Sequence, residues 1–202
     1  IGLCLVGSEM CIRDSIGNNC AIGNAYPTFE ETRKYLAPGL FGPCGYGLPS
    51  VVGAKIGRPD VPVVGFSGDG AFGIAVTELT AIGREEWPAV TQIVFRNYQW
   101  GAEKRNSTLW YDDNFVGTEL DTQVSYAGIA KACGLQGIVA KTMAELTEAL
   151  HTAIKDQMEN GKTTLIEAMI NQELGEPFRR DAMKKPVAVA GISASDMREQ
   201  VV

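Results

Sequence analysis

The 202-residue chain has one histidine and no long apolar segment. His151 stands alone on a helical pattern, in a position that looks exposed, so the sequence supports neither a Ser-His-Asp nor a Cys-His catalytic system. No run of about 18 apolar residues occurs, and no membrane-spanning helix is expected. Basic residues are outnumbered, 18 against 24 acidic ones for a net charge of −6, which argues against a nucleic-acid-binding face.

Cysteine is also used sparingly, with five residues at positions 4, 11, 20, 44 and 133. The count is odd and no C-x-x-C pair occurs, which favours free thiols over the alternative of a disulfide framework. We therefore expect reduced thiols in a cytoplasmic protein.

Residues 1–15 look foreign to the rest of the chain, because they resemble translated sequencing-adapter DNA. They lack the basic start and the small-residue cleavage site of a secretory signal peptide. We expect this segment to be artefactual and the natural N-terminal region to be missing.

From residue 35 onward, apolar runs alternate with helical patterns. Strands are expected over residues 35–38, 61–66, 90–95, 137–140 and 163–169. Helices are expected over residues 50–56, 71–84 and 122–133, and from a capping box at Thr142 onward, with an apolar stripe of Met143, Leu146, Leu150 and Ile154. This alternation predicts an α/β fold with a doubly wound parallel sheet flanked by helices, whose ligands bind beyond the carboxyl ends of the strands.

The turn Gly68-Asp69-Gly70 follows the strand expected at 61–66. Its glycines expose backbone N–H groups at the start of a helix, which is a suitable place for a phosphate. Asp69 would repel a phosphate unless a divalent cation lay between them, and magnesium commonly shares oxygen ligands with phosphates in this way. The simpler alternative is an ordinary turn, in which Asp-Gly is common.

Asn97 follows the next expected strand, 90–95. Because neighbouring parallel strands end at the same edge of a sheet, its amide oxygen can join the Asp69 carboxylate on one metal ion. The alternative for Asn97 is a turn or capping residue. The pair, followed by Tyr98-Gln99-Trp100-Gly101, is more specific than either residue alone.

Gly68-Asp69-Gly70 together with Asn97 resembles the diphosphate-binding motif of the thiamine-diphosphate enzymes, and residues 42–49 resemble the glycine-rich segment of their acetolactate synthase and pyruvate oxidase members. The resemblance implies thiamine diphosphate and Mg²⁺ as cofactors. The implied metal ligands are the side chains of Asp69 and Asn97 and the backbone carbonyl of Gln99. The implied cofactor-binding set is Cys44, Gly45, Gly68, Asp69, Gly70, Ala71, Asn97, Gln99, Trp100 and Gly101. The chain departs from the family pattern in having Cys44 where methionine is common and Arg96 where a second asparagine is common.

Residues 16–19, 97–106, 161–167 and 173–182 are similar to the sulfoacetaldehyde acetyltransferases within that family. This resemblance, which runs from about residue 16 to about residue 186, implies conversion of sulfoacetaldehyde and phosphate to acetyl phosphate and sulfite, as in taurine degradation. Both substrates are anions, so the site needs cationic donors. The candidates are Lys104, Arg105, Arg179 and Arg180, with solvated surface charges as the alternative.

We expect the chain to divide into the foreign segment 1–15, a diphosphate-binding domain over 16–172 and a charged tail over 173–202 that contains Pro177 and Pro186. In this family the glutamate that activates the aminopyrimidine comes from a separate domain of the partner subunit, and no part of the chain resembles that domain. We therefore expect a C-terminal domain that is inactive by itself and acts in a homo-oligomer or with a missing partner domain. The alternatives are a natural short subunit of a thiamine-diphosphate-dependent 2-oxo acid decarboxylase or acetolactate synthase-like enzyme, and a non-catalytic assembly module.

Overall fold

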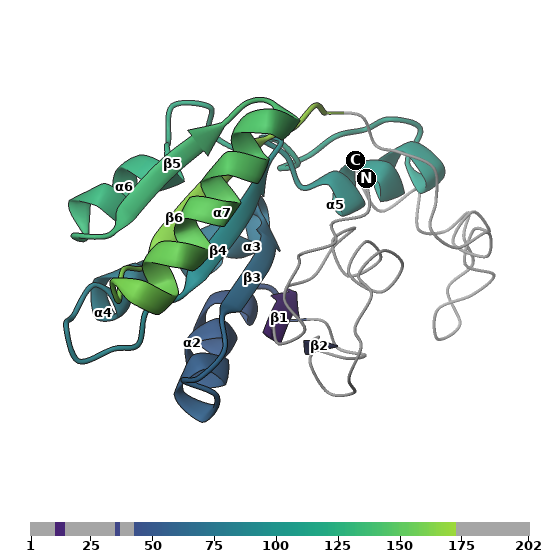
Figure 1. The fold of residues 1–202 in the computed structure, drawn as a ribbon. Coiled ribbons are helices and arrows are strands. Elements are labelled where there is room, and N and C mark those ends of the chain that lie inside the picture. The colour runs from purple at the N-terminus through teal and green to yellow at the C-terminus, as the bar shows by residue number, and fades with distance from the viewer. Residues whose placement is uncertain (1–10, 15–34, 37–42, 173–202) are drawn as a thin grey trace.

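The computed structural model describes residues 11–14, 35–36 and 43–172, which form a parallel sheet of six strands in the order β2-β1-β3-β4-β6-β5 (Figure 1). The strands are β1 (Cys11–Asp14), β2 (Tyr35–Leu36), β3 (Val63–Gly68), β4 (Thr91–Arg96), β5 (Gln136–Ala140) and β6 (Thr164–Met169). All five strand pairings are parallel. The two central strands β3 and β4 are buried along most of their length, as the apolar run of residues 61–66 predicts for β3; β4 is buried although it contains Thr91, Gln92 and Arg96.

Helices cover both faces of the sheet. They are α2 (Gly47–Gly57), α3 (Asp69–Ile74), α4 (Leu79–Ile82), α5 (Gly101–Trp110), α6 (Tyr126–Ala132) and α7 (Met143–Glu159), with a short 3₁₀ turn η1 (Val76–Glu78). One apolar cluster joins α2, α3, α4 and α6 to one face, and a second joins α7 to the other. In Figure 1, α7 crosses in front of β4 and β6. The expected doubly wound α/β fold is confirmed.

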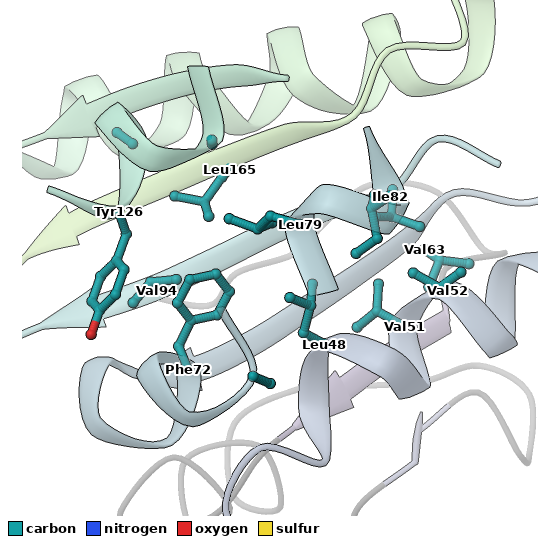
Figure 2. Packing of buried hydrophobic residues seen from close by; sticks show 14 of the residues in the cluster. Leu48, Val51, Val52, Val63, Phe72, Leu79, Ile82, Val94, Tyr126 and Leu165 are labelled. Atoms are coloured by element: carbon teal, nitrogen blue, oxygen red, sulfur yellow. The ribbon is translucent and has the colours of Figure 1, made fainter. Parts of the chain in front are cut away.

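The first cluster contains an aromatic pair at its edge nearest the end of β3. Figure 2 shows Phe72 and Tyr126 close together, with Val94 between them in this view and Leu165 above. The two rings meet edge to face, with centroids 5.0 Å apart and planes at 80°. This is a favoured arrangement of aromatic rings, and it fixes α6 against α3.

Two helical expectations need correction. The single helix expected over 71–84 is divided into α3, η1 and α4, because the backbone at Ala75 leaves helical geometry and its N–H donates to the carbonyl oxygen of Phe72, three residues back. The helix α5 was not expected, since it is mostly polar and shows no clear apolar stripe.

The capped helix α7 begins where the capping pattern predicts. Oγ1 of Thr142 accepts a hydrogen bond from the N–H of Glu145 at 3.2 Å. Leu150 is buried, and Leu146 and Ile154 pack against the same cluster. Met143 is 47% exposed, so the prediction of a core position is wrong there; at this first turn of the helix the apolar stripe has run past the packed layer.

The strand β1 falls within the segment that we expected to be foreign. It pairs with β2 on one side and β3 on the other, with Cys11 opposite Val63. The division of the chain at residues 15 and 172 remains a prediction. None of the helices in the described ranges combines the length and the apolar composition that crossing a bilayer requires.

Candidate metal centre

The carboxyl ends of β3 and β4 meet at one edge of the sheet. Gly68 pairs with Phe95, so the segments that follow these residues leave the sheet side by side. The first contains Asp69, at the start of α3, and the second contains Asn97. The parallel register therefore brings together the two side chains that the sequence selected.

Asp69 is only 1% exposed and is bound by the loop that follows β4. Its Oδ2 accepts hydrogen bonds from the N–H groups of Tyr98 at 2.6 Å and Asn97 at 3.1 Å, and from Nη1 of Arg96 at 3.1 Å. Its Oδ1 accepts one hydrogen bond, from the N–H of Gly70 at 3.0 Å. One carboxylate oxygen is thus saturated with donors, and the other retains a lone pair.

The surroundings of Asp69 have opposite effects on its pKa. Burial raises the pKa of Asp69, while the hydrogen bond from Tyr98 and the charge of Arg96 lower it. A divalent cation at Oδ1 would favour the ionised carboxylate further.

The side-chain amide of Asn97 turns one atom toward Oδ1 of Asp69 and the carbonyl oxygen of Gln99. That atom lies 3.2 Å from the first and 3.1 Å from the second. Nitrogen at that place donates to both acceptors and satisfies them. Oxygen at that place accepts from the N–H of Gln99 at 3.3 Å, and it would face the two other oxygens only with a cation between them. Octahedral Mg²⁺ binds oxygens at about 2.0–2.1 Å, so adjacent ligands lie about 3 Å apart. Both separations match that requirement.

The donor set itself fits magnesium. Within the ranges that the structure describes, no three His, Cys, Asp or Glu side chains gather as a metal-binding group. The candidate centre instead combines one carboxylate with an amide oxygen and a backbone carbonyl. Mg²⁺ is bound in this manner, through few protein oxygens, with remaining positions left for phosphate oxygens and water.

Strained backbone shapes the loop after β4. Tyr98 has a φ of +60°, which is unusual for a residue with a side chain and costs on the order of 1–3 kcal/mol. This conformation directs its N–H to Asp69 and places its ring over the guanidinium of Arg96, 4.2 Å from the centroid. The strained residue therefore contributes a hydrogen bond that fixes the candidate metal ligand Asp69.

The other residues expected to bind cofactor approach from two further segments. A Cβ added to Gly70 would lie 2.8–2.9 Å from the ring of Trp100, so only glycine fits between that ring and the start of α3. Gly45 has a φ of +86° and lies against Ile74 at the end of α3. Burial raises the pKa of the neighbouring Cys44 thiol, and the charge of Glu103 on α5 raises it further.

The remaining expected residues fall at the same edge or nearby. Gly101 begins α5, and a Cβ there would lie 3.7 Å from Nδ2 of Asn97. Ala71 is buried in the first turn of α3. Gln99 is buried, and its Nε2 donates to the carbonyl oxygen of Gln172 at 2.9 Å. The expected cofactor residues are therefore gathered around the ends of β3 and β4.

The candidate anion donors are not gathered in the same way. Lys104 pairs with Glu119 and lies over the ring of Phe115, 5.3 Å from the centroid. Arg105 is half-buried on α5. Arg179 and Arg180 lie outside the described residues. Their roles remain predictions.

Two charged residues of the centre were missed from the sequence as functional candidates. Arg96 is 1% exposed and ion-pairs with Asp69, and Glu167 on β6 is 3% exposed and lies 3.5 Å from Nε of Arg96. The sequence did carry one signal for these two residues, namely a charged residue within or directly after a strand expected to be buried. A buried charge rarely lacks a partner. From the sequence alone, Arg96 was noted only because the family commonly has a second asparagine at that position.

A doubly wound parallel sheet with a carboxylate and an amide at adjacent strand ends defines a cofactor-binding α/β domain. Residues 15–168 match the family described as thiamine pyrophosphate enzyme, C-terminal TPP binding domain. The chain therefore belongs to the thiamine pyrophosphate enzymes, as expected from its motif.

Similar proteins with names indicate which members of this family the chain resembles. The chain is 84% identical to the sulfoacetaldehyde acetyltransferase of Roseovarius nubinhibens over 194 residues, which are 96% of this chain and 32% of that protein. It is 78% identical to the same enzyme of Rhodobacter capsulatus over 95% of this chain and 32% of that protein. The chain thus spans about a third of the length of these relatives.

A solved structure has the same fold. The thiamine diphosphate-dependent 4-hydroxybenzoylformate decarboxylase of Rhodococcus jostii RHA1 superposes with a TM-score of 0.70 at 25% identity, over 84% of this chain and 31% of that one. Together with the named relatives, this confirms the fold class and the resemblance to sulfoacetaldehyde acetyltransferases.

Proposed function

We propose that this chain is the metal- and diphosphate-binding part of a thiamine-diphosphate-dependent acetyltransferase that converts sulfoacetaldehyde and phosphate to acetyl phosphate and sulfite. The names of relatives at 84% and 78% identity support the choice of reaction. Because the chain covers 32% of those proteins, the activity belongs to a longer protein or an assembly. By itself the chain is inactive, and the activating glutamate comes from a partner domain, in a homo-oligomer or a complex.

The observation that carries this proposal is that Oδ1 of Asp69, the Asn97 amide and the Gln99 carbonyl oxygen meet at one place. The amide atom of Asn97 lies 3.2 Å from the first oxygen and 3.1 Å from the second, which are the spacings of neighbouring Mg²⁺ ligands if the amide turns its oxygen toward the ion. An ordinary turn has no need for a buried carboxylate with three donors on one oxygen and only the N–H of Gly70 and the Asn97 amide beside the other. Asp69, Asn97 and Gln99 would hold the ion, and the ion would hold the diphosphate.

When bound, thiamine diphosphate supplies an electron sink at its thiazolium ring. The chain contributes binding and orientation. The turn of Gly70 and Ala71 would face the diphosphate, and the Cys44–Gly45 loop, next to Ile74, would lie along the aminopyrimidine. Arg105, Arg179 and Arg180 are the candidate donors to the sulfonate and phosphate of the substrates, and Lys104 would first have to leave Glu119.

The test supplies the missing part from a relative. The chain is co-expressed with the portion of the Roseovarius nubinhibens enzyme that it does not match, and sulfite release and acetyl phosphate formation are measured with sulfoacetaldehyde and phosphate. We expect phosphate-dependent activity that D69N reduces by more than the roughly 10–100-fold that outer partners of a metal ligand cost. D60N is the matched control, since Asp60 is exposed, pairs with Arg58, and precedes β3 at the end of the strand opposite to Asp69.

The choice of substrate is tested in the same assay. Consumption of pyruvate or another 2-oxo acid in place of sulfoacetaldehyde would contradict the proposed reaction and favour the decarboxylase or acetolactate synthase-like alternative. Equal activity of D69N and the unmodified chain would contradict the metal centre.

A further inference from the structure

Arg96 is a fully buried cation directly behind the candidate metal ligand. Its Nη1 donates to Oδ2 of Asp69 at 3.1 Å, and its Nη2 donates to the carbonyl oxygens of Asp121 at 2.6 Å and Val124 at 3.0 Å. The rings of Tyr98 and Tyr126 flank the guanidinium at 4.2 and 4.9 Å from their centroids. With so many fixed partners, Arg96 has one position, and it determines which oxygen of Asp69 remains available.

Glu167 lies on the other side of the guanidinium. Its Oε1 is 3.5 Å from Nε of Arg96, and its Oε2 accepts hydrogen bonds from Oγ of Ser125 at 2.9 Å and the N–H of Ala127 at 3.1 Å. Those last two contacts anchor the start of α6. Glu167 thus combines a structural contact with a charge that faces Arg96.

The charges of this group are unequal. Asp69 and Glu167 bring two negative charges against the one positive charge of Arg96, so the three residues carry a net charge of −1. An arginine beside a metal ligand repels an incoming divalent cation, and in a buried site that repulsion is weakly screened. A second carboxylate behind the arginine offsets the repulsion.

We propose that Arg96 and Glu167 are positioning residues for the metal ion: Arg96 holds Asp69 through Oδ2 so that Oδ1 faces the ion, and Glu167 balances the charge that Arg96 brings beside it. This inference rests on the proposed metal centre. It assigns part of the metal affinity to a glutamate of β6 that touches no metal ligand and acts through Arg96.

The experiment measures binding of Mn²⁺, as a probe for Mg²⁺, to the 202-residue chain in the presence of thiamine diphosphate. The free ion is quantified by its electron paramagnetic resonance signal, and circular dichroism verifies folding of every variant. We expect E167Q to lower the affinity roughly 10–100-fold, as is common for outer partners of a metal ligand. S125A is the matched control: it removes one contact of Glu167 without changing any charge, and its affinity should stay within about twofold of the unmodified chain.

A second pair of variants separates charge balance from packing. R96N leaves Glu167 buried without its cation and should weaken both folding and Mn²⁺ binding. R96N combined with E167Q removes both charges and should recover stability relative to R96N, because the buried carboxylate no longer lacks its cation; its Mn²⁺ affinity should stay below that of the unmodified chain, because Oδ2 of Asp69 has lost the donor that positions it.

The outcomes distinguish the two proposals. No Mn²⁺ binding by the unmodified chain overturns the metal centre and this inference with it. Binding by the unmodified chain with equal affinity in E167Q overturns the inference alone. Equal losses in S125A and E167Q, or no recovery of stability in the double variant, also overturn it, since they assign the role of Glu167 to the anchoring of α6.

Discussion

Tyr126 connects the apolar core with the candidate metal centre through one hydroxyl group. Its ring packs against Phe72, and its hydroxyl donates to the carbonyl oxygen of Asp69 at 3.0 Å. Gly73 lies against the same hydroxyl, since a Cβ added there would be 2.7 Å from Oη. The absence of a side chain at Gly73 therefore leaves space for the hydrogen bond to Asp69.

We predict that G73A destabilises the chain by on the order of 1–3 kcal/mol, because the methyl group displaces the Tyr126 hydroxyl in a packed region. Adding Y126F removes the atom that clashes, so the double variant should lose less stability than the sum of the two single variants. Urea denaturation measures both quantities.

The control for this prediction is G53A, at a helical position of α2 where an added Cβ meets no atom within 4 Å. It should stabilise the chain by up to about 1 kcal/mol, as alanine generally does in a helix. A stability of G73A equal to that of the unmodified chain would show that the Tyr126 hydroxyl moves without cost.

Some residues of the candidate metal centre can be identified from the sequence and others cannot. Asp69 and Asn97 are recognisable because each follows a buried apolar run, and parallel strands end at a common edge. Arg96 and Glu167 are not recognisable as a pair, since β4 and β6 are separated by α5, α6, β5 and α7 in the chain. Neighbours across a sheet depend on strand order, which local patterns do not determine.

Gln157 fastens α7 to the sheet. Its Oε1 accepts from the N–H of Val63 at 2.7 Å, and its Nε2 donates to the carbonyl oxygen of Val63 at 2.8 Å and to Oγ1 of Thr91 at 3.0 Å. One side chain thus satisfies the backbone at the start of β3, the strand that leads to Asp69.

We predict that Q157M, which keeps the approximate volume, lowers the free energy of unfolding by about 2–4 kcal/mol. Two buried backbone groups of Val63 lose their partners, and each such loss costs about 1–3 kcal/mol. H151M is the control on the exposed face of α7 and should change stability by less than about 0.5 kcal/mol. Similar values for both variants in chemical denaturation would contradict the role of Gln157.

The elements also differ in how far their patterns predict them. β3, β4, β6 and α7 follow from apolar runs and from a capping residue. The division of the 71–84 helix does not, because no glycine–proline signal or change of apolar spacing marks Ala75, where the backbone leaves helical geometry. α5 carries Gly101 and Lys104 at its start, and its polar composition gives no periodic signal.

For the whole molecule, cofactor and ion should stabilise the fold only in combination. A ligand that binds the folded chain alone adds about 2.7 kcal/mol when present at 100 times its dissociation constant. We expect thiamine diphosphate with Mg²⁺ to raise the unfolding midpoint, each alone to leave it nearly unchanged, and a chelator to reverse the rise.

The same scan on D69N provides the control, since this variant should show no rise with either ligand or both. A rise that persists with the chelator would mean that the diphosphate binds without the ion, and the role given to Asp69 and Asn97 would be wrong. Because the chain covers about a third of the length of its relatives, we expect it to bind the cofactor weakly and the rise of the unfolding midpoint to be small.

The carboxamide of Asn97 has one further consequence. With its nitrogen toward Oδ1 of Asp69 and the carbonyl oxygen of Gln99, the amide closes the loop after β4 by hydrogen bonds. An ion at that place would need the amide oxygen there instead. We therefore expect binding of the ion to turn the carboxamide over by rotation around a single bond, which is a smaller change than rebuilding the loop.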